Sequence, residues 1–242
     1  MKLKILFSLL TAEVLFSLAC NKQNSIVVPT PTSAVNIVNA SVNSSPLVPN
    51  FSNDTIKWFA NAQTIGYGSS FEYSVASGNN VILAISQTSD TATVIFKASL
   101  NLKPRGIYSL FYCGEPSQNG ADTLFIEDQI PFYGITDSVV GVRFVNLVFG
   151  NTAISVNIQG DSVGSEIASL RYKGVSNFKS YPATSDVVSG YTFEIRDAVS
   201  GTLLSTFTYS SFILFKNVTL VISGDDHDLS NVKVNSFLIN NF

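Results

Sequence analysis

The sequence predicts an all-β protein built as two tandem β-sandwich domains, and three observations support this prediction. Short segments rich in β-branched and aromatic residues recur along the chain, bounded by Gly, Asn, Ser or Pro, as is typical of strands. No helical period separates these segments after the first 20 residues. Two strand-like segments also occur twice: AVNIVNA at residues 34–40 resembles GVRFVNL at residues 141–147, and YSLFYCG at residues 108–114 resembles VTLVISG at residues 218–224.

The two matches have similar offsets, which indicates an internal repeat. Val35 matches Val142, 107 positions later, and Tyr108 matches Val218, 110 positions later. Self-similarity at a nearly fixed period is evidence about architecture. The length of 242 residues accommodates two domains of roughly 100 residues, each with a core of its own. We therefore expect a first repeat at residues 34–130, a linker at 131–138 and a second repeat at 139–242.

Composition excludes one class of partner. Only 13% of the residues are charged and 45% are hydrophobic, so Ser, Thr, Asn and Gly must supply most of the polar surface. The 14 Lys and Arg residues against 17 Asp and Glu give a net charge of −3, with no basic run. This balance lacks the electrostatic footprint of phosphate-backbone binding, so we expect no nucleic-acid partner.

The amino terminus is predicted to be a lipoprotein signal peptide, residues 1–19. Lys2 and Lys4 precede an apolar stretch that ends in Ala19 and Cys20, as in a secretory signal. The Ala19–Cys20 junction resembles the lipobox of bacterial lipoproteins, which predicts lipidation of Cys20, including palmitate. A plain secretory signal is the alternative. The uninterrupted apolar runs are shorter than the ~20 residues that a membrane span needs.

Residues 20–33 are expected to form a lipidated tether. Pro29 and Pro31 alternate with Thr30 and Thr32, which favours an extended, semi-rigid spacer. The predicted location is the cell envelope, on the periplasmic or surface face of the outer membrane.

The predicted strands are short and separated by turn residues, which indicates immunoglobulin-like sandwiches. In the first repeat they lie at residues 34–40, 55–59, 71–75, 80–86, 93–100, 106–113 and 122–127. In the second repeat they lie at residues 141–147, 154–159, 169–173, 190–196, 203–208, 217–223 and 232–239. Turns are expected at residues 77–80, 103–106 and 197–201. Alternating apolar residues in the first strand of each repeat predict that these strands are half-buried.

Several segments carry a family resemblance. IGYGSSFEYSV at residues 65–75, DTLFIEDQIP at 122–131, LRYKGVSNFKSY at 170–181 and GYTFEIRD at 190–197 resemble the bacterial domain of unknown function numbered 4397. The resemblance implies an immunoglobulin-like fold, often in tandem in lipoproteins of Bacteroidetes, and brings no catalytic residues. Many members read close to S-P-D-A-P after the first strand, whereas residues 41–49 here read SVNSSPLVP.

Two motifs could carry catalysis, and the context favours neither. Residues 160–164 match the G-x-S-x-G nucleophile elbow around Ser162, but that elbow needs a strand that turns into a helix. Once Cys20 is lipidated, Cys113 is the remaining cysteine, and a nucleophilic role would need a histidine within reach. The single histidine, His227, lies in the other repeat, so we expect Cys113 to be a core residue near a strand end. We predict no enzyme activity and no cofactor.

An acidic loop offers a candidate calcium site. Residues 224–228 place Asp225, Asp226 and Asp228 around His227, and Ca²⁺ prefers oxygen ligands. The spacing does not match an EF-hand, and the corresponding loop of the first repeat lacks the cluster. A solvated hairpin tip is the favoured alternative.

Aromatic residues offer a candidate sugar site. Trp58, with Tyr67 or Tyr133, would serve if their rings were exposed in a line or cleft. The alternative is core packing, because neighbouring residues on a strand face opposite sides. Phe132 and Tyr133 in the linker are expected to pack at the domain junction. Repeated Asp-hydroxyl pairs, such as Asp90–Thr91 and Asp161–Ser162, resemble an O-glycosylation pattern of exported Bacteroidetes proteins.

These inferences lead to two functional hypotheses. The first is a non-enzymatic envelope lipoprotein that presents two sandwich domains for adhesion, ligand binding or assembly with other surface proteins. The second is a carbohydrate-binding accessory lipoprotein of a polysaccharide uptake system.

Overall fold

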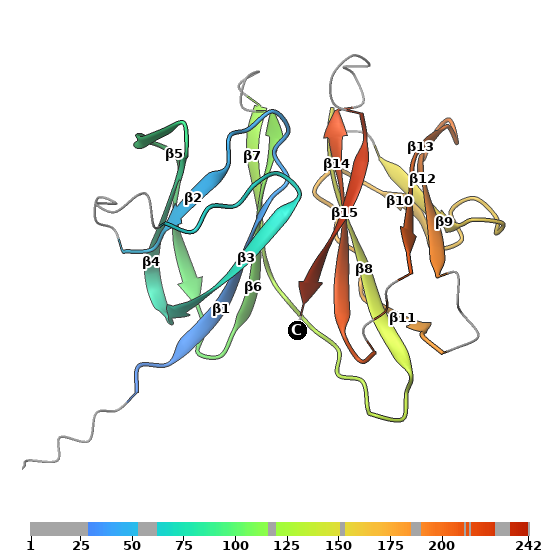
Figure 1. The fold of residues 1–242 in the computed structure, drawn as a ribbon, viewed down its shortest axis with the longest axis horizontal. Coiled ribbons are helices and arrows are strands. Elements are labelled where there is room, and N and C mark those ends of the chain that lie inside the picture. Colours follow the sequence, from blue (N-terminus) through green and yellow to red (C-terminus); the bar gives the residue numbers. More distant parts are fainter. Residues whose placement is uncertain are drawn as a thin grey trace, which may run out of the picture. The chain divides into compact units, whose positions relative to one another are not determined.

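The computed structural model describes residues 29–52, 62–115, 120–150, 153–184, 190–210, 212, 214–225 and 233–241. Every regular element in these ranges is a strand, so the all-β prediction is confirmed (Figure 1). The described ranges contain no helical segment with the length and hydropathy that crossing a membrane requires.

Fifteen strands are described, and most follow the predicted segments. The first half contains β1 (Thr32–Asn39), β2 (Leu47–Asn50), β3 (Ser69–Ala76), β4 (Gly78–Gln87), β5 (Asp90–Leu102), β6 (Ile107–Glu115) and β7 (Gly120–Glu127). The second half contains β8 (Val139–Phe149), β9 (Ile154–Ile158), β10 (Ile167–Leu170), β11 (Lys179–Pro182), β12 (Tyr191–Asp197), β13 (Leu203–Tyr209), β14 (Asn217–Asp225) and β15 (Asn235–Asn241). The strand predicted at residues 55–59 lies outside the described residues.

Each half pairs two sheets in an immunoglobulin-like sandwich. The first half has sheets β3-β1-β6-β7 and β2-β4-β5, and the second has β11-β8-β14-β15 and β10-β9-β12-β13. In the sheets that contain them, β1 pairs in parallel with β6, and β8 with β14. Val35 lies opposite Tyr108 and Val142 opposite Val218, so the repeated segments pair in one register in both halves.

Two strands were not predicted, and both lie at sheet edges. β2 falls in the segment predicted as a loop, where Pro49 lowers strand propensity. β11 is four residues long and ends at Pro182. A proline is tolerated there because an edge strand leaves some of its backbone N–H groups outside the ladder.

Each sandwich encloses a core of its own. The first core combines residues of both sheets, including Ile37, Leu83, Ile85 and Leu110. The second core combines Phe144 and Leu220 from one sheet with Phe193 and Ile195 from the other. Burial of apolar area between two sheets supplies most of the stabilisation of such a sandwich.

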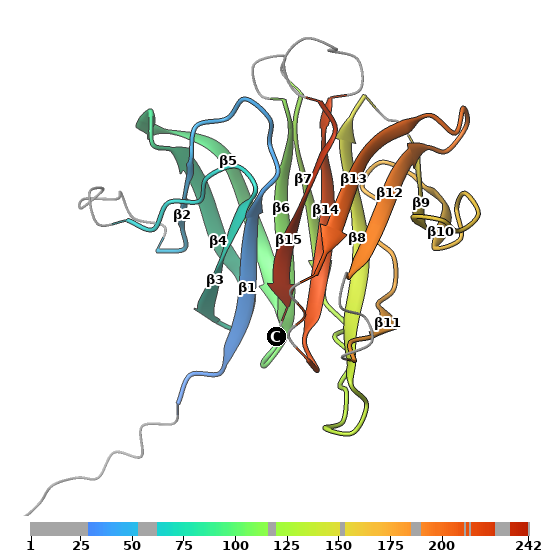
Figure 2. The ribbon, with the colours of Figure 1, turned by 45° about the vertical axis from the view of Figure 1, so that its right-hand side comes forward.

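A third core joins the two halves, and residues Pro31–Phe242 form one compact unit (Figure 2). Its members come from β1 and the residue after it, and from β6, β8, β14 and β15: Val38, Ala40, Phe111, Cys113, Val145, Leu147, Val221 and Ile239. Because one face of β1 and β8 packs on the inner core and the other on this third core, the prediction of half-buried strands is wrong. The domain limits at 34–130 and 139–242 stay a prediction.

Two contacts across the junction between the halves involve equivalent positions of the repeat. The hydroxyl of Tyr67 is hydrogen-bonded to that of Ser223 at 2.7 Å, and the hydroxyl of Tyr172 lies 3.6 Å from the Cys113 sulfur. Cys113 and Ser223 are equivalent in the repeat, 110 positions apart. In both halves a tyrosine hydroxyl therefore contacts the same position of the other half's parallel-paired strand.

A buried asparagine recurs at the same place in both repeats. The Asn39 amide donates to the carbonyl of Ile65 at 3.0 Å, and the Asn146 amide donates to that of Leu170 at 2.9 Å. Each side-chain oxygen also accepts from the backbone N–H two residues on. These bonds satisfy the buried side-chain amides and tie β1 and β8 to the segments that contain Ile65 and Leu170, since buried polar groups need partners.

The linker departs from its prediction at one residue. Phe132 is 94% exposed, so it does not pack at the junction as expected. Tyr133 is partly buried, and its hydroxyl lies close to Gly141 at the start of β8, where a side chain larger than glycine would meet it.

Candidate functional site

Several residues predicted as sites lie outside the described residues: Cys20, Trp58, Asp226, His227 and Asp228. Asp225 is described, and it is buried at the end of β14. In the described part of the chain, no three His, Cys, Asp or Glu side chains gather closely enough to hold a metal ion. The candidate calcium site therefore stays a prediction.

The serine motif lies in a loop between two strands. Ser162 is exposed between β9 and β10, where the Ser165 N–H donates to the Ser162 carbonyl at 3.0 Å. The predicted context is thus confirmed: the chain passes from strand to strand, without the helix that a nucleophile elbow requires.

Cys113 is a core residue, as predicted. Its side chain is fully buried in β6 within the third core. Burial raises the pKa of the Cys113 thiol to about 12, and the Tyr172 hydroxyl opposes that shift only in part. The thiol therefore stays protonated at neutral pH, and a protonated thiol is a poor nucleophile.

Tyr67 takes part in the junction rather than in a platform. It is 37% exposed, its hydroxyl is bonded to Ser223, and its ring lies edge-on to Phe237 with centroids 6.0 Å apart. Trp58 lies outside the described residues, and Tyr133 packs at the start of β8. The described residues therefore do not bring the predicted sugar-binding aromatics together.

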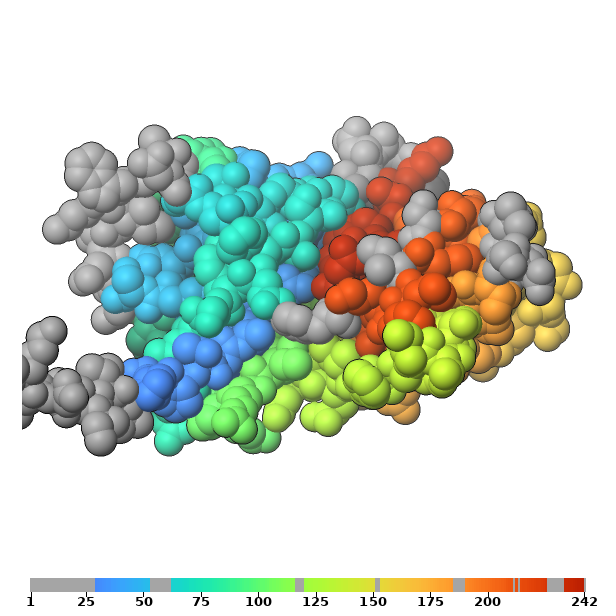
Figure 3. Space-filling view, turned by 60° about the horizontal axis from the view of Figure 1, so that its bottom comes forward, coloured from blue at the N-terminus to red at the C-terminus, as the bar shows by residue number. Residues whose placement is uncertain are grey.

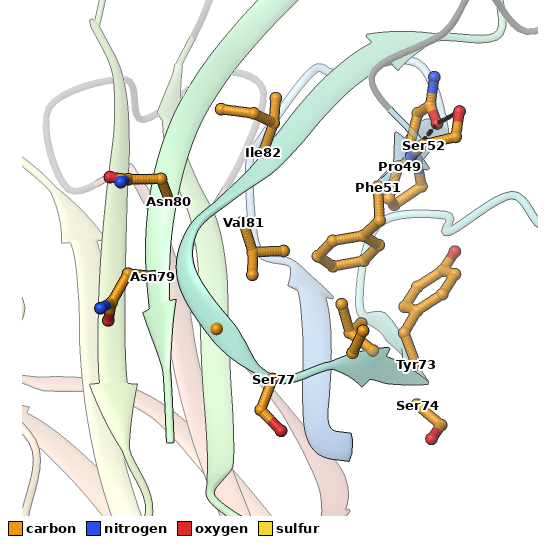
Figure 4. A pocket seen from close by; sticks show the side chains of 14 residues that line it. Pro49, Phe51, Ser52, Tyr73, Ser74, Ser77, Asn79, Asn80, Val81 and Ile82 are labelled. Carbon is orange, nitrogen blue, oxygen red and sulfur yellow. Dashed lines mark hydrogen bonds between the residues drawn. The ribbon is translucent and has the colours of Figure 1, made fainter. Parts of the chain in front are cut away.

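The strongest candidate site was not predicted, and it is a cavity of about 720 Å³ at one end of the first sandwich. The end of β2, the end of β3 and the start of β4 form its walls. Phe51, Tyr73 and Val81 project toward one another from these three segments, whereas Asn79 and Asn80 point away from them (Figure 4). None of the described residues that line the cavity is charged.

The second sandwich shows why the first has space at this position. By strand register, Val75 corresponds to Tyr181, Val81 to Tyr191 and Leu100 to Tyr209. The three tyrosines fill the equivalent end of the second sandwich together with Phe212, with ring centroids 4.9–5.6 Å apart for neighbouring pairs. Two of the aliphatic side chains, Val75 and Val81, line the cavity of the first sandwich, where the second has Tyr181 and Tyr191.

Tyr73 is one of the polar residues that line the cavity, together with Asn50, Ser52, Ser74, Ser77, Asn79 and Asn80. Its ring is tilted against Phe51 and edge-on to Phe71, with centroids 5.4 and 4.9 Å away. Its hydroxyl oxygen is buried and has no hydrogen-bond partner among the described residues. Burial raises the pKa of Tyr73 to about 12, so the hydroxyl stays a neutral donor at physiological pH. A buried donor without a partner is rare, and a ligand acceptor or a water molecule would satisfy it.

Comparisons with known proteins give only distant likenesses. No family model and no curated protein matches the chain. One similar solved structure is a family 26 carbohydrate-binding module from Eubacterium rectale Amy13K in complex with maltoheptaose, at 12% identity over 87% of this chain and 97% of the other, with a TM-score of 0.27. Another is the fimbrial anchor protein Mfa2 from Porphyromonas gingivalis, at 9% identity over 87% of this chain and 100% of the other, with a TM-score of 0.20. These TM-scores are too low to support a function.

The fold and the cavity together define the class of protein: a paired β-sandwich with a ligand-sized, uncharged cavity in one of its halves. Cavities of this size commonly hold small ligands, and a largely apolar wall with few polar groups is their usual lining.

Proposed function

We propose that this protein is a non-enzymatic cell-envelope lipoprotein that binds an uncharged ligand in the cavity of its first sandwich. The observation that carries the proposal is the buried Tyr73 hydroxyl beside an apolar cavity that the equivalent residues fill in the second sandwich. A neutral ligand with apolar and polar groups, one of them an acceptor for the Tyr73 hydroxyl, matches this lining. The resemblance to the domain of unknown function 4397 belongs to the same proposal and agrees with a surface role in adhesion, ligand binding or assembly.

Anchoring at Cys20 is the second part of the proposal. Replacing Cys20 with Ala removes the predicted acylation site, so palmitate labelling should disappear and the protein should move from the membrane to the soluble fraction. Multiple acyl chains give stable anchoring, so the shift should be nearly complete. Unchanged labelling of the Cys20→Ala variant would refute the anchor, and a Cys113→Ala variant is the matched control.

Filling the cavity should weaken ligand binding. Val81→Tyr copies the residue at the equivalent position of the second sandwich, so we expect it to occupy the cavity while the fold is retained. Binding should weaken at least about tenfold, a loss of roughly 1.4 kcal/mol. A glycan array and cross-linking from intact cells with the chain from Asn21 onward would identify the ligand.

Val199→Tyr is the control for this substitution. Val199 is 92% exposed and lies between β12 and β13 of the second sandwich, whereas the cavity is in the first. A ligand that binds Val81→Tyr as tightly as the unmodified protein would show that the cavity is not its site. Turnover of ester or glycoside substrates that is lost in Ser162→Ala would refute the non-enzymatic assignment.

The alternative function is carbohydrate binding as an accessory of polysaccharide uptake. The cavity supports it through the rings of Phe51 and Tyr73 and through its uncharged lining, because sugars stack on aromatic rings and bond to neutral polar groups. Saturable glycan binding that Val81→Tyr abolishes would favour this alternative. Cross-linked protein partners without glycan binding would favour adhesion or assembly.

A further inference from the structure

One end of the molecule gathers the start of the folded chain and the linker between the halves. This tether end comprises the start of β1 at Thr32, residues 103–106, the linker at residues 131–138 and residues 214–216. The Arg105 N–H donates to the Thr32 carbonyl at 2.8 Å, and the Gly141 N–H donates to the Lys216 carbonyl at 2.9 Å. The amide of Asn217 donates to the Pro131 carbonyl at 2.9 Å, so both halves contribute to one end (Figure 3).

Apolar side chains are exposed at the tether end. Phe132 is 94% exposed and Ile135 is 86% exposed, both in the linker, and Leu214 beside them in the fold is 41% exposed. The linker is held in place: the Gly134 N–H donates to the Asp137 carboxylate, and the Asp137 N–H donates to the Gly134 carbonyl at 3.0 Å. Exposed apolar groups on an ordered projection are typical of a contact surface.

Basic side chains flank these apolar residues. Lys103, Arg105 and Lys216 are exposed at the tether end. Glu127 pairs with Lys103 at 2.6 Å, and Asp137 keeps its negative charge while it accepts from the Gly134 N–H. Three cations against two carboxylates, 3 − 2, leave this end with a net charge of +1. Lys and Arg beside aromatic and aliphatic side chains are the composition of a membrane-interface contact, because the apolar groups enter the acyl boundary and the basic groups face anionic headgroups.

We propose that the tether end lies on the surface of a phospholipid bilayer, with Phe132 and Ile135 inserted at the headgroup boundary. The inference rests on the proposed function at one point: the proposed anchor at Cys20 would hold this end of the protein near a membrane. A tether from residue 21 to residue 31 spans roughly 40 Å at most when fully extended. The tether end therefore stays near any membrane that holds Cys20, at a high effective concentration.

Vesicle sedimentation tests the proposal without the lipid anchor. The chain from Asn21 onward is mixed with phosphatidylcholine vesicles that contain phosphatidylglycerol, and the bound fraction is measured against lipid concentration. We expect the Phe132→Ser, Ile135→Ser double variant to lower the partition coefficient about tenfold or more, since it removes two inserted apolar side chains. Added salt should weaken the binding of the unmodified chain.

Val199→Ser is the matched control. Val199 is as exposed as Phe132 and belongs to the turn between β12 and β13, where the Ala198 N–H donates to the Ala153 carbonyl. The hairpin of β12 and β13 turns at the opposite end of the molecule from the linker (Figure 2). Val199→Ser should bind vesicles like the unmodified chain. No vesicle binding by the unmodified chain, or equal losses in both variants, would overturn the proposal. The vesicle assay needs neither ligand binding in the cavity nor palmitate labelling at Cys20, and both are measured separately. A negative result in either of them would not change the outcome of the vesicle assay.

Discussion

Replacing Arg143 with Met is expected to lower the free energy of unfolding by about 3–5 kcal/mol, because it leaves a buried carboxylate without its partner. Arg143 and Asp128 form an ion pair at 2.7 Å, and their side chains are 4% and 1% exposed. The Arg143 Nε–H also donates to the Thr219 hydroxyl at 2.7 Å. The Ser109 hydroxyl donates to the other Asp128 oxygen at 2.7 Å, so the remaining carboxylate would keep one neutral donor.

Urea denaturation followed by circular dichroism measures the loss. Lys103→Met removes an exposed pair with Glu127 and should shift the midpoint little, since water screens that pair. The double variant Arg143→Met, Asp128→Leu should regain much of the stability lost in the single variant, because no buried charge remains. A loss below about 1 kcal/mol in Arg143→Met would contradict the assignment of a buried, coupled pair.

The ion pair of Arg143 and Asp128 is not repeated at the equivalent positions of the repeat. Thr219 bonds to Asn241 as Ser109 bonds to Asp128, and the two hydroxyl residues are equivalent in the repeat. Arg143 occupies the position of Asn36 in the first repeat and contacts residues from both halves. Two ion pairs therefore connect the halves: the buried Arg143–Asp128 pair and the more exposed Lys173–Asp122 pair at 2.9 Å.

Replacing Phe111 with Ala is expected to cost about 3–5 kcal/mol of unfolding free energy, as truncations of buried aromatic residues do. Phe111 is fully buried in the third core, among residues of both halves. The truncation leaves a cavity between sheets that pack on both of their faces, so the surrounding strands have little freedom to collapse into it. The change in the urea midpoint at constant slope measures the loss.

Phe132→Ala is the control for this truncation, since it makes the same change at a residue that is 94% exposed. It should stay within about 0.5 kcal/mol of the unmodified protein. Equal stability of the two variants would show that the third core contributes nothing to folding.

The sequence by itself determined the class of fold and the repeat. Alternation with a period of two and turn residues such as Asn80 and Gly201 are local signals, and both of these residues adopt positive φ. The matches of Val35 with Val142 and of Tyr108 with Val218 also predicted equivalent positions, which the register of the parallel pairs confirms. These local patterns predict strands and turns correctly because they do not depend on what the strand packs against.

Only the tertiary structure decided what covers each face. β1 and β8 are buried on both sides because a second sandwich packs against the first, and a strand pattern alone does not distinguish water from another sheet on its outer face. The exposure of Phe132 follows from the same arrangement, since the linker runs past the junction instead of through it.

The cavity depended on contacts between residues far apart in the chain. Val75 and Val81 are ordinary strand residues in sequence, and both line the cavity together with Phe51 and Tyr73. The repeat alignment contained a signal, since tyrosines stand at the equivalent positions of the second half. Reading that signal required the strand register, because volume inside a sandwich is set jointly by side chains that only pairing brings together.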